Sequence, residues 1–154
     1  MRPIKMSALF TALILVFLSG SPQGGKAAET AYLIRIADSI GPGIADHVKN
    51  GIEQASRADA ACLIVELDTP GGLAESMRTI VRAIYASAVP VVVYVSPSGA
   101  RAASAGVMIT MAAHIAAMAP GTNIGAAHPV SAGGKEINET MSAKVTNDMV
   151  AYIK

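Results

Sequence analysis

The stretch 101–106 holds the residue best suited to nucleophilic chemistry, Ser104, set among alanines and a glycine. An apolar run and a Pro/Gly turn precede it, and an unbroken apolar segment of helical character follows it. A serine hydroxyl attacks a carbonyl only where a tight turn holds its backbone between small neighbours, as in the strand–turn–helix motif G-x-S-x-G. Here the motif is relaxed to Ala102-x-Ser104-x-Gly106. By pattern alone, close helix packing is the commoner explanation of such a run of small residues.

Acyl transfer also needs hydrogen-bond donors for the oxyanion, and the turn Gly71-Gly72 fits that role. Glycine lets a backbone N–H approach a substrate closely, and this turn precedes a helix whose N-terminus carries partial positive charge. The Ala105 N–H, one residue past the serine, is the second expected donor. Loss of one such donor typically costs about 10²–10³ in rate. Without a nucleophile at Ser104, Pro-Gly-Gly is better explained as a plain turn.

Three residues are candidates for the general base. His114 lies ten residues from Ser104, about 15 Å along a helix, so a buried histidine at the start of a strand explains it better. His128 lies beyond that strand and could fold back toward the site, with an imidazole suited to base work. Lys144 lies at the edge of an apolar helical stripe, where desolvation favours the neutral amine that deprotonates a serine. Asp148, four residues on, could instead pair with Lys144 and keep it protonated. By pattern alone this solvated pair is the more probable state.

The elements that must position these residues follow from hydrophobic periodicity. Apolar runs at 30–37, 62–67, 89–95 and 114–119 predict strands, and helical spacing marks 43–57, 73–84 and the segment after residue 104. This β-α-β-α-β-α-β order indicates a parallel sheet with crossover helices. Similar Pro/Gly turns end three of the strands, with prolines 27 and 23 residues apart, which favours a spiral of repeated strand–turn–helix units. Ligands bind at the carboxyl ends of such strands, so all three turns are expected to crowd one site.

Two further segments complete this organisation. Cys62 stands alone inside an apolar strand, so it is expected in the core rather than as a reactive thiol. Residues 131–136 form a predicted loop, and apolar residues after it recur at helical spacing up to the last residue. The chain stops within this stripe, which predicts a domain that is incomplete at its C-terminus.

The N-terminal 27 residues have the layout of a secretory signal. They hold three basic and no acidic residues, and a 13-residue apolar segment at 6–18 is followed by small residues. That segment is short for a membrane span, which needs about 20 residues; an uncleaved N-terminal anchor is the alternative. Residues 28–154 are then one domain outside the cytoplasm. Removing residues 1–27 leaves 12 − 3 = 9 basic against 11 acidic residues, and the chain has no basic patch for nucleic acid.

Four motifs occur in order and together resemble a known family. They are Asp68-Thr69-Pro70-Gly71-Gly72, residues 101–106, Met118-Ala119-Pro120-Gly121-Thr122-Asn123-Ile124-Gly125-Ala126-Ala127, and Lys144-Val145-Thr146-Asn147-Asp148. From about residue 32 to 154 the chain resembles the catalytic domain of the NfeD-type, membrane-bound Clp-class serine proteases, also called stomatin operon partner proteases. The resemblance implies an α/β fold, a Clp/crotonase-like spiral with a parallel sheet. Family members continue past the last helix, so the C-terminal part of the domain is expected to be missing here.

The resemblance also assigns roles to individual residues. Ser104 matches the nucleophile of the family, and Lys144 matches the general base of a Ser–Lys dyad. Gly72 matches the oxyanion donor of Clp-type proteases, with the Ala105 amide as its partner. His128 falls close to the position of the histidine in the Clp peptidase, so a Ser–His arrangement stays open as the alternative.

The function implied by the resemblance is a serine endopeptidase that works without a cofactor. Its expected substrates are hydrophobic segments of stomatin-like membrane proteins, cleaved at the membrane outside the cytoplasm by a homodimer or larger assembly. A crotonase-like enzyme would use the same oxyanion turns on an acyl thioester, but the export signal argues against it because coenzyme A is cytoplasmic. A non-catalytic module that binds a membrane partner is the third alternative.

Overall fold

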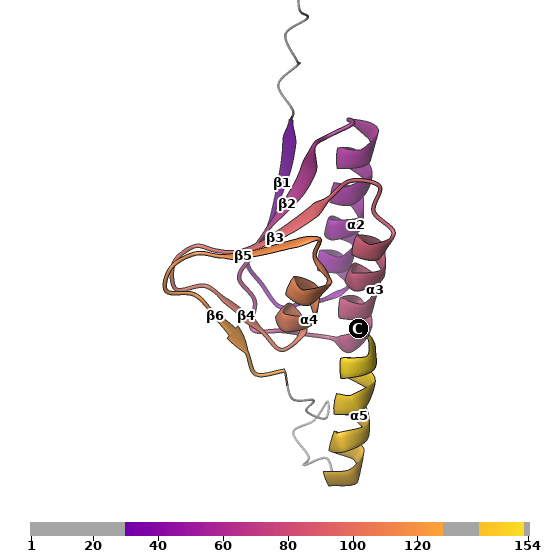
Figure 1. Ribbon diagram of the computed structural model, residues 1–154, viewed down its shortest axis with the longest axis vertical. Helices are drawn as coiled ribbons and strands as arrows, with labels where there is room; N and C mark the ends of the chain where they lie inside the picture. Colours follow the sequence, from indigo (N-terminus) through magenta and orange to yellow (C-terminus); the bar gives the residue numbers. More distant parts are fainter. Residues whose placement is uncertain (1–29, 128–138, 153–154) are drawn as a thin grey trace, which may run out of the picture.

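The computed structural model describes residues 30–127 and 139–152, in which strands and helices alternate along the chain (Figure 1). In order the elements are β1 (Ala31–Ile36), α2 (Pro42–Arg57), β2 (Cys62–Leu67), α3 (Ala74–Tyr85), β3 (Val91–Val95), β4 (Arg101–Ala103), α4 (Ala105–Ala112), β5 (Ile115–Met118), β6 (Asn123–Gly125) and α5 (Glu139–Tyr152). The predicted succession of four main strands and three crossover helices is confirmed. The short strands β4 and β6 are additions that periodicity did not predict.

Strands β1, β2, β3 and β5 form one parallel sheet in that spatial order. The register places Arg35 opposite Glu66, Glu66 opposite Tyr94, and Tyr94 opposite Ala117. Because all four strands run in the same direction, their carboxyl ends gather at one edge of the sheet. The loops that follow the strands at this edge carry the Pro/Gly turns, which is where a parallel sheet usually binds its ligands.

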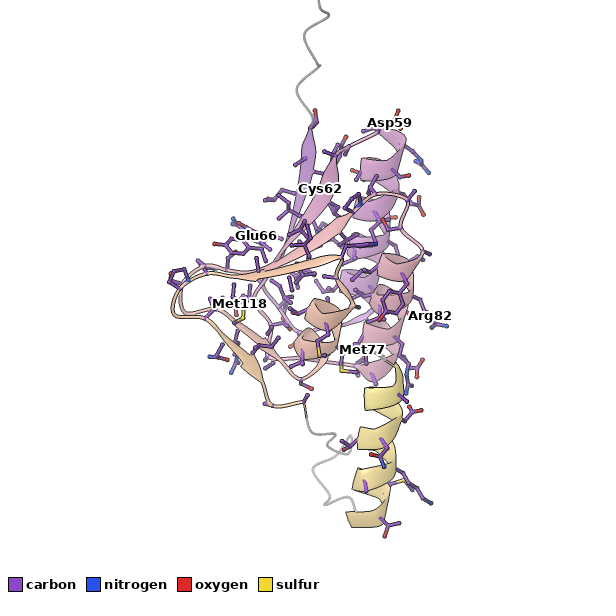
Figure 2. The ribbon with its side chains drawn as sticks, in the orientation of Figure 1. Asp59, Cys62, Glu66, Met77, Arg82 and Met118 are labelled. Atoms are coloured by element: carbon purple, nitrogen blue, oxygen red, sulfur yellow. The ribbon has the colours of Figure 1, made fainter. Side chains whose placement is uncertain are left out.

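Helices α2, α3 and α4 lie on the same side of this sheet (Figure 1). The apolar stripe of α3 faces the core, and its members Met77, Ile80, Val81 and Ile84 are at most 1% exposed; Met77 is labelled in Figure 2. Full burial of each such side chain contributes roughly 1.5–3 kcal/mol to folding. The core therefore lies between the helices and one face of the sheet, and it anchors the strand ends that carry the turns.

The other face of the sheet is open in the described part of the chain. Buried and half-buried residues alternate along β2 and β3, and Leu33 and Ile115 are each 56% exposed. Cys62 belongs to the half-buried set and is a free thiol (Figure 2), so the prediction that it lies in the core is wrong. The physical reason is the period of two along a strand, which turns Cys62 away from the face that Leu63 presents to the core.

A second, two-stranded parallel sheet lies beyond the main one. It pairs β4 with β6, with Arg101 opposite Asn123 and Ala103 opposite Gly125. A bridge between Thr69 and Ala102 joins the loop after β2 to this small sheet. The turn that carries Ser104 is therefore fixed between two strands and the N-terminus of α4.

Several sequence-based predictions fall on residues outside the described part of the chain. These are the signal or anchor over residues 1–27, the loop at 131–136, and His128. Within residues 30–127 and 139–152, no helix has both the length and the apolar character needed to span a bilayer.

Candidate active site

Ser104 occupies a strained turn between β4 and α4. Its backbone has φ 53° and ψ −112°, a conformation that residues other than glycine rarely adopt and that costs about 1–3 kcal/mol. The Ser104 N–H donates to the Gly125 carbonyl at 2.9 Å, and the Ser104 carbonyl accepts from the Val107 N–H at 3.0 Å. Strain at a strand-to-helix turn is the geometry that presents a nucleophile in the G-x-S-x-G motif, so the relaxed pattern in the sequence corresponds to an elbow.

Gly71 packs directly against the serine. A Cβ at Gly71 would lie 2.6 Å from the Ser104 Cβ and 3.1 Å from its Oγ, and the Gly71 φ of +111° also favours glycine. Any side chain at this position would displace the serine hydroxyl or the turn. Sequence reasoning had grouped Gly71 with Gly72 as an oxyanion donor and missed this contact. The doubled glycine was the available signal: it indicates that another group approaches the backbone closely, but it does not identify that group.

Gly72 is held by a strand-like bridge to Ile40. The Ile40 N–H donates to the Gly71 carbonyl at 2.7 Å, and the Leu73 N–H donates to the Ile40 carbonyl at 2.8 Å. A Cβ at Gly72 would clash with the Ile40 carbonyl oxygen. In such a bridge the N–H of the central residue points away from its partner strand, and no described residue accepts a hydrogen bond from the Gly72 N–H.

Ala105 is the first residue of α4, and its N–H is one of those that a helix cannot satisfy internally. Within residues 30–127 and 139–152 it donates to no other group. The turn before it is tied to the loop after β2, because the Arg101 N–H donates to the Asp68 Oδ1 at 3.0 Å. The structure thus brings Ser104 and Gly71-Gly72 together, and it leaves two backbone N–H groups, those of Gly72 and Ala105, without a partner among the described residues.

Two of the candidate bases, Lys144 and His114, belong to the described residues, and neither forms a hydrogen bond with Ser104. Lys144 is exposed on α5 and makes no hydrogen bond or ion pair to any described residue, Ser104 included. Asp148 does not pair with Lys144 as expected from their spacing; its Oδ2 lies 3.2 Å from the Arg78 guanidinium on α3. His114 stands just before β5, but it is exposed rather than buried, and its Nδ1 accepts from the Val91 N–H at 3.1 Å.

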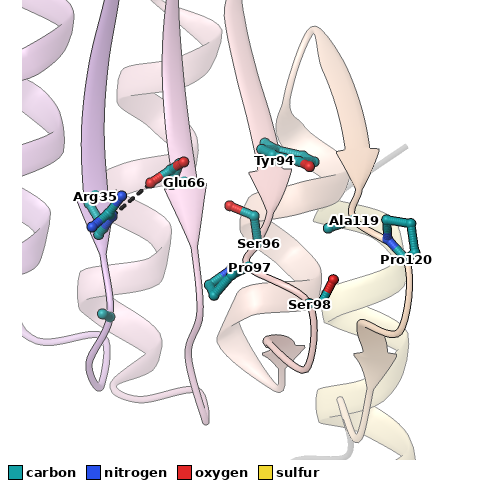
Figure 3. A pocket seen from close by; sticks show the side chains of 9 residues that line it. Arg35, Glu66, Tyr94, Ser96, Pro97, Ser98, Ala119 and Pro120 are labelled. Atoms are coloured by element: carbon teal, nitrogen blue, oxygen red, sulfur yellow. Dashed lines mark hydrogen bonds and ion pairs between the residues drawn. The ribbon is translucent and has the colours of Figure 1, made fainter.

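The second and third Pro/Gly turns line a different hollow, of about 560 Å³, near the ends of the strands (Figure 3). Arg35 and Glu66 form an ion pair of 2.7 Å at its wall, and the two turns bond to each other through Gly99 and Gly121. Ser104 is not among the residues that line it. The first turn packs against the serine through Gly71, whereas the second and third turns line this hollow; that all three turns crowd one site stays a prediction. No group of three or more His, Cys, Asp and Glu gathers as a metal site in the described ranges.

The chain is similar in sequence to a known family and to a known protease. The family described as "NfeD1b, N-terminal domain" matches residues 30–152. The membrane-bound protease PH1510 of Pyrococcus horikoshii is 41% identical over 148 residues, which make up 95% of this chain and 33% of that protein. The chain thus spans about a third of the length of the curated relatives it matches.

Solved structures agree with the sequence matches. A membrane-bound stomatin-specific protease named 1510-N superposes with a TM-score of 0.73 at 40% identity, both as a lysine-to-alanine mutant in complex with a substrate peptide and as a serine-to-alanine mutant. The overlap covers 82% of this chain and 58% of the first structure, and 80% and 60% for the second. ClpP1 from Listeria monocytogenes, 22% identical, superposes with a TM-score of 0.62 over 79% of this chain and 71% of its own. The predicted Clp-type α/β fold with a parallel sheet is confirmed.

Proposed function

Because this chain belongs to the NfeD1b N-terminal domain family, within the NfeD-type Clp-class serine proteases, we propose that it is a serine endopeptidase with Ser104 as its nucleophile. The observation that carries the proposal is the strained elbow, with Ser104 at φ 53° and Gly71 packed against it. Two N–H groups that donate to no described residue, those of Gly72 and Ala105, flank the same turn. This combination supplies a presented hydroxyl and the two donors of an oxyanion hole.

In the proposed mechanism Lys144 is the base. Its neutral Nζ takes the proton of the Ser104 hydroxyl while Oγ adds to the scissile carbonyl, and the Gly72 and Ala105 N–H groups stabilise the resulting oxyanion. When the C–N bond breaks, Lys144 Nζ returns the proton to the leaving amine. Water then hydrolyses the acyl-enzyme, with the Lys144 amine again as the base. For these steps Nζ has to come within about 2.6–3.2 Å of Oγ.

Two observations support lysine over histidine. The 1510-N protease has solved structures of both a serine-to-alanine and a lysine-to-alanine mutant, the latter in complex with a substrate peptide. In this chain the Asp148 carboxylate pairs with Arg78, so the helix neighbour expected to pair with Lys144 binds another residue. His128 remains the alternative base that the experiment below separates.

The proposed substrates are hydrophobic segments of stomatin-like membrane proteins. The 1510-N protease is stomatin-specific, and two relatives, the membrane-bound protease PH1510 and the membrane protein NfeD1b of Bacillus subtilis, are named as membrane proteins. In this chain Leu73, next to Gly72, is 58% exposed, and Ile124, next to Gly125, is 41% exposed, so exposed apolar residues adjoin two of the segments around the serine in sequence. We place the enzyme at the membrane outside the cytoplasm and expect it to act as a homodimer or larger assembly.

The test is cleavage of a synthetic peptide that covers the hydrophobic segment of a stomatin homologue. Wild type, Ser104→Ala, Lys144→Ala and His128→Ala are compared side by side, with Ser98→Ala in the exposed second turn as the matched control. We expect cleavage by wild type, His128→Ala and Ser98→Ala only. Cleavage by Ser104→Ala at the wild-type rate, or none by wild type, would refute the protease; loss in His128→Ala with retention in Lys144→Ala would replace the base.

A further inference from the structure

One buried hydroxyl, that of Thr69, links the turn at residues 69–72, the oxyanion turn, to the rest of the fold. Thr69 is 0% exposed, and its Oγ1 donates to the Asp38 carbonyl at 2.7 Å. The same Oγ1 accepts from the Gly71 N–H at 3.1 Å. A hydroxyl has one proton to donate and two lone pairs to accept with, so Thr69 joins the loop after β1 to the turn that touches Ser104.

The backbone of Thr69 is bonded to the strand that leads into the serine. Its N–H donates to the Arg101 carbonyl at 2.7 Å, and its carbonyl accepts from the Ala103 N–H at 3.0 Å. Both ends of β4 are therefore attached to one residue of the oxyanion turn. A movement of Thr69 would change the distance between that turn and Ser104.

The methyl group of Thr69 makes a third contact, with the start of α4. A Cβ at Gly106 would lie 2.7 Å from the Thr69 Cγ2, so the methyl fills the space that this glycine leaves open. The N-terminus of α4 supplies the Ala105 N–H. Thr69 thus touches the supports of both expected oxyanion donors.

The Gly71 N–H is the group whose direction depends most on this hydroxyl. Bound to the Thr69 Oγ1, it is engaged with the protein, while the next N–H, that of Gly72, is bound to no described residue. Without the hydroxyl, the Gly71 N–H would be buried and unsatisfied, and the turn would rotate to find another partner. From these contacts, and resting on the proposed protease function, we propose that Thr69 is a positioning residue that directs the Gly72 N–H at the oxyanion.

The decisive variants separate the hydroxyl of Thr69 from its shape. Thr69→Val keeps the branched shape and removes the hydroxyl, whereas Thr69→Ser keeps the hydroxyl and removes the methyl. Thr110→Val is the matched control, because Thr110 is also buried and its Oγ1 makes a single hydrogen bond, to the Gly106 carbonyl at 2.8 Å within α4. We expect Thr69→Val to lower kcat by about 10- to 100-fold with KM changed by less than about 3-fold, since loss of an oxyanion donor typically costs about 10²–10³. Thr69→Ser and Thr110→Val should stay within about 3-fold of the wild-type kcat.

A second measurement makes the test independent of catalysis. Amide hydrogen exchange of the Gly71 N–H should accelerate by at least about 10-fold in Thr69→Val and change little in Thr69→Ser or Thr110→Val. If Thr69→Val does not fold, Thr69→Cys takes its place, because a thiol is a weaker hydrogen-bonding group of similar size; intermediate losses are then expected. An unchanged kcat or unchanged Gly71 exchange in a folded hydroxyl-free variant would overturn the inference, as would an equal kcat loss in Thr69→Ser. A wild type that does not cleave at all refutes the protease instead, and the exchange result still decides whether the hydroxyl holds the turn.

Discussion

The two members of the proposed dyad are built into the molecule in different ways. The Ser104 N–H is bonded to Gly125, Gly71 packs against the serine, and the buried Thr69 is bonded to the strand that leads into it. Lys144 instead is exposed on α5, where Asp148 of the same helix forms an ion pair with Arg78 and its side chain is 67% exposed. Buried backbone bonds fix geometry, whereas exposed ion pairs are worth only about 0–1 kcal/mol. Buried bonds therefore fix the turns that carry the proposed nucleophile and its proposed oxyanion donors, whereas the ion pair between α5, which carries the proposed base, and α3 is an exposed one.

The largest expected separation between the two regions comes from Lys144. Lys144→Met should lower kcat by at least about 10³-fold, because it removes the general base, and it should leave the melting temperature within about 1 °C, because the side chain is exposed. Lys144→Arg is the matched control, since a guanidinium keeps the positive charge and does not deprotonate. Retained cleavage in Lys144→Arg would mean that the lysine acts only as a cation. A large drop in melting temperature would contradict this prediction, because it would show that Lys144 stabilises the fold.

Gly71→Ala should affect both activity and stability. The new Cβ would meet Ser104 at 2.6 Å at a φ of +111°, so we expect kcat to fall by about 10²–10³-fold and unfolding free energy by at least about 2 kcal/mol. Peptide cleavage and denaturant titration measure the two effects. Gly99→Ala is the matched control, because Gly99 also has a positive φ, +90°, but open space around its Cβ position. If both variants lose equal activity, backbone strain rather than contact with Ser104 is responsible.

The difference between the regions also explains what the sequence could predict. The main strands and helices could be predicted from hydrophobic periodicity because the core lies on one side of the sheet. A helix that packs on that side, such as α3, has one apolar stripe, and its spacing is visible in the sequence. The strands β4 and β6 have three residues each, too few to show any period. The contact of Gly71 with Ser104 joins segments 33 positions apart, and no local pattern encodes it.

Two of the side-chain predictions that failed did so for related reasons. The spacing of Lys144 and Asp148 satisfies a local rule for helix pairs, but Arg78, seventy residues earlier, binds the carboxylate instead. For Cys62, an apolar neighbourhood was correct and the face was wrong, because a run of continuous apolar residues does not reveal which side of the sheet is covered. Local chemistry predicted the residue types at the site, and tertiary contacts decided their partners.

A smaller effect is expected at the start of α4. Gly106→Ala would place a Cβ 2.7 Å from the Thr69 methyl, a distance that real Cβ atoms essentially never show, so either α4 or the oxyanion turn has to shift. We expect kcat to fall by about 10-fold and stability by about 1–3 kcal/mol, the usual cost of overpacking. The double variant Gly106→Ala/Thr69→Ser removes the methyl and should recover most of the activity. No recovery would show that the contact with Thr69 is not the cause.

The smallest expected effect tests the attachment of α5. Asp148→Asn removes the charge that pairs with Arg78 at 3.2 Å, and an exposed pair of this kind is worth about 0–1 kcal/mol and is screened by salt. We expect kcat within about 3-fold of wild type and a stability loss no larger than that of Glu53→Gln. That control breaks an exposed ion pair of the same length, Arg57–Glu53 at 3.2 Å on α2, away from the site. A different outcome would show that this surface pair positions the base: a tenfold lower activity of Asp148→Asn than of the wild type at low salt, not seen for Glu53→Gln, and equal activities at high salt. The nucleophile would then be held by buried bonds and the base by charge, and ionic strength would control only the second of them.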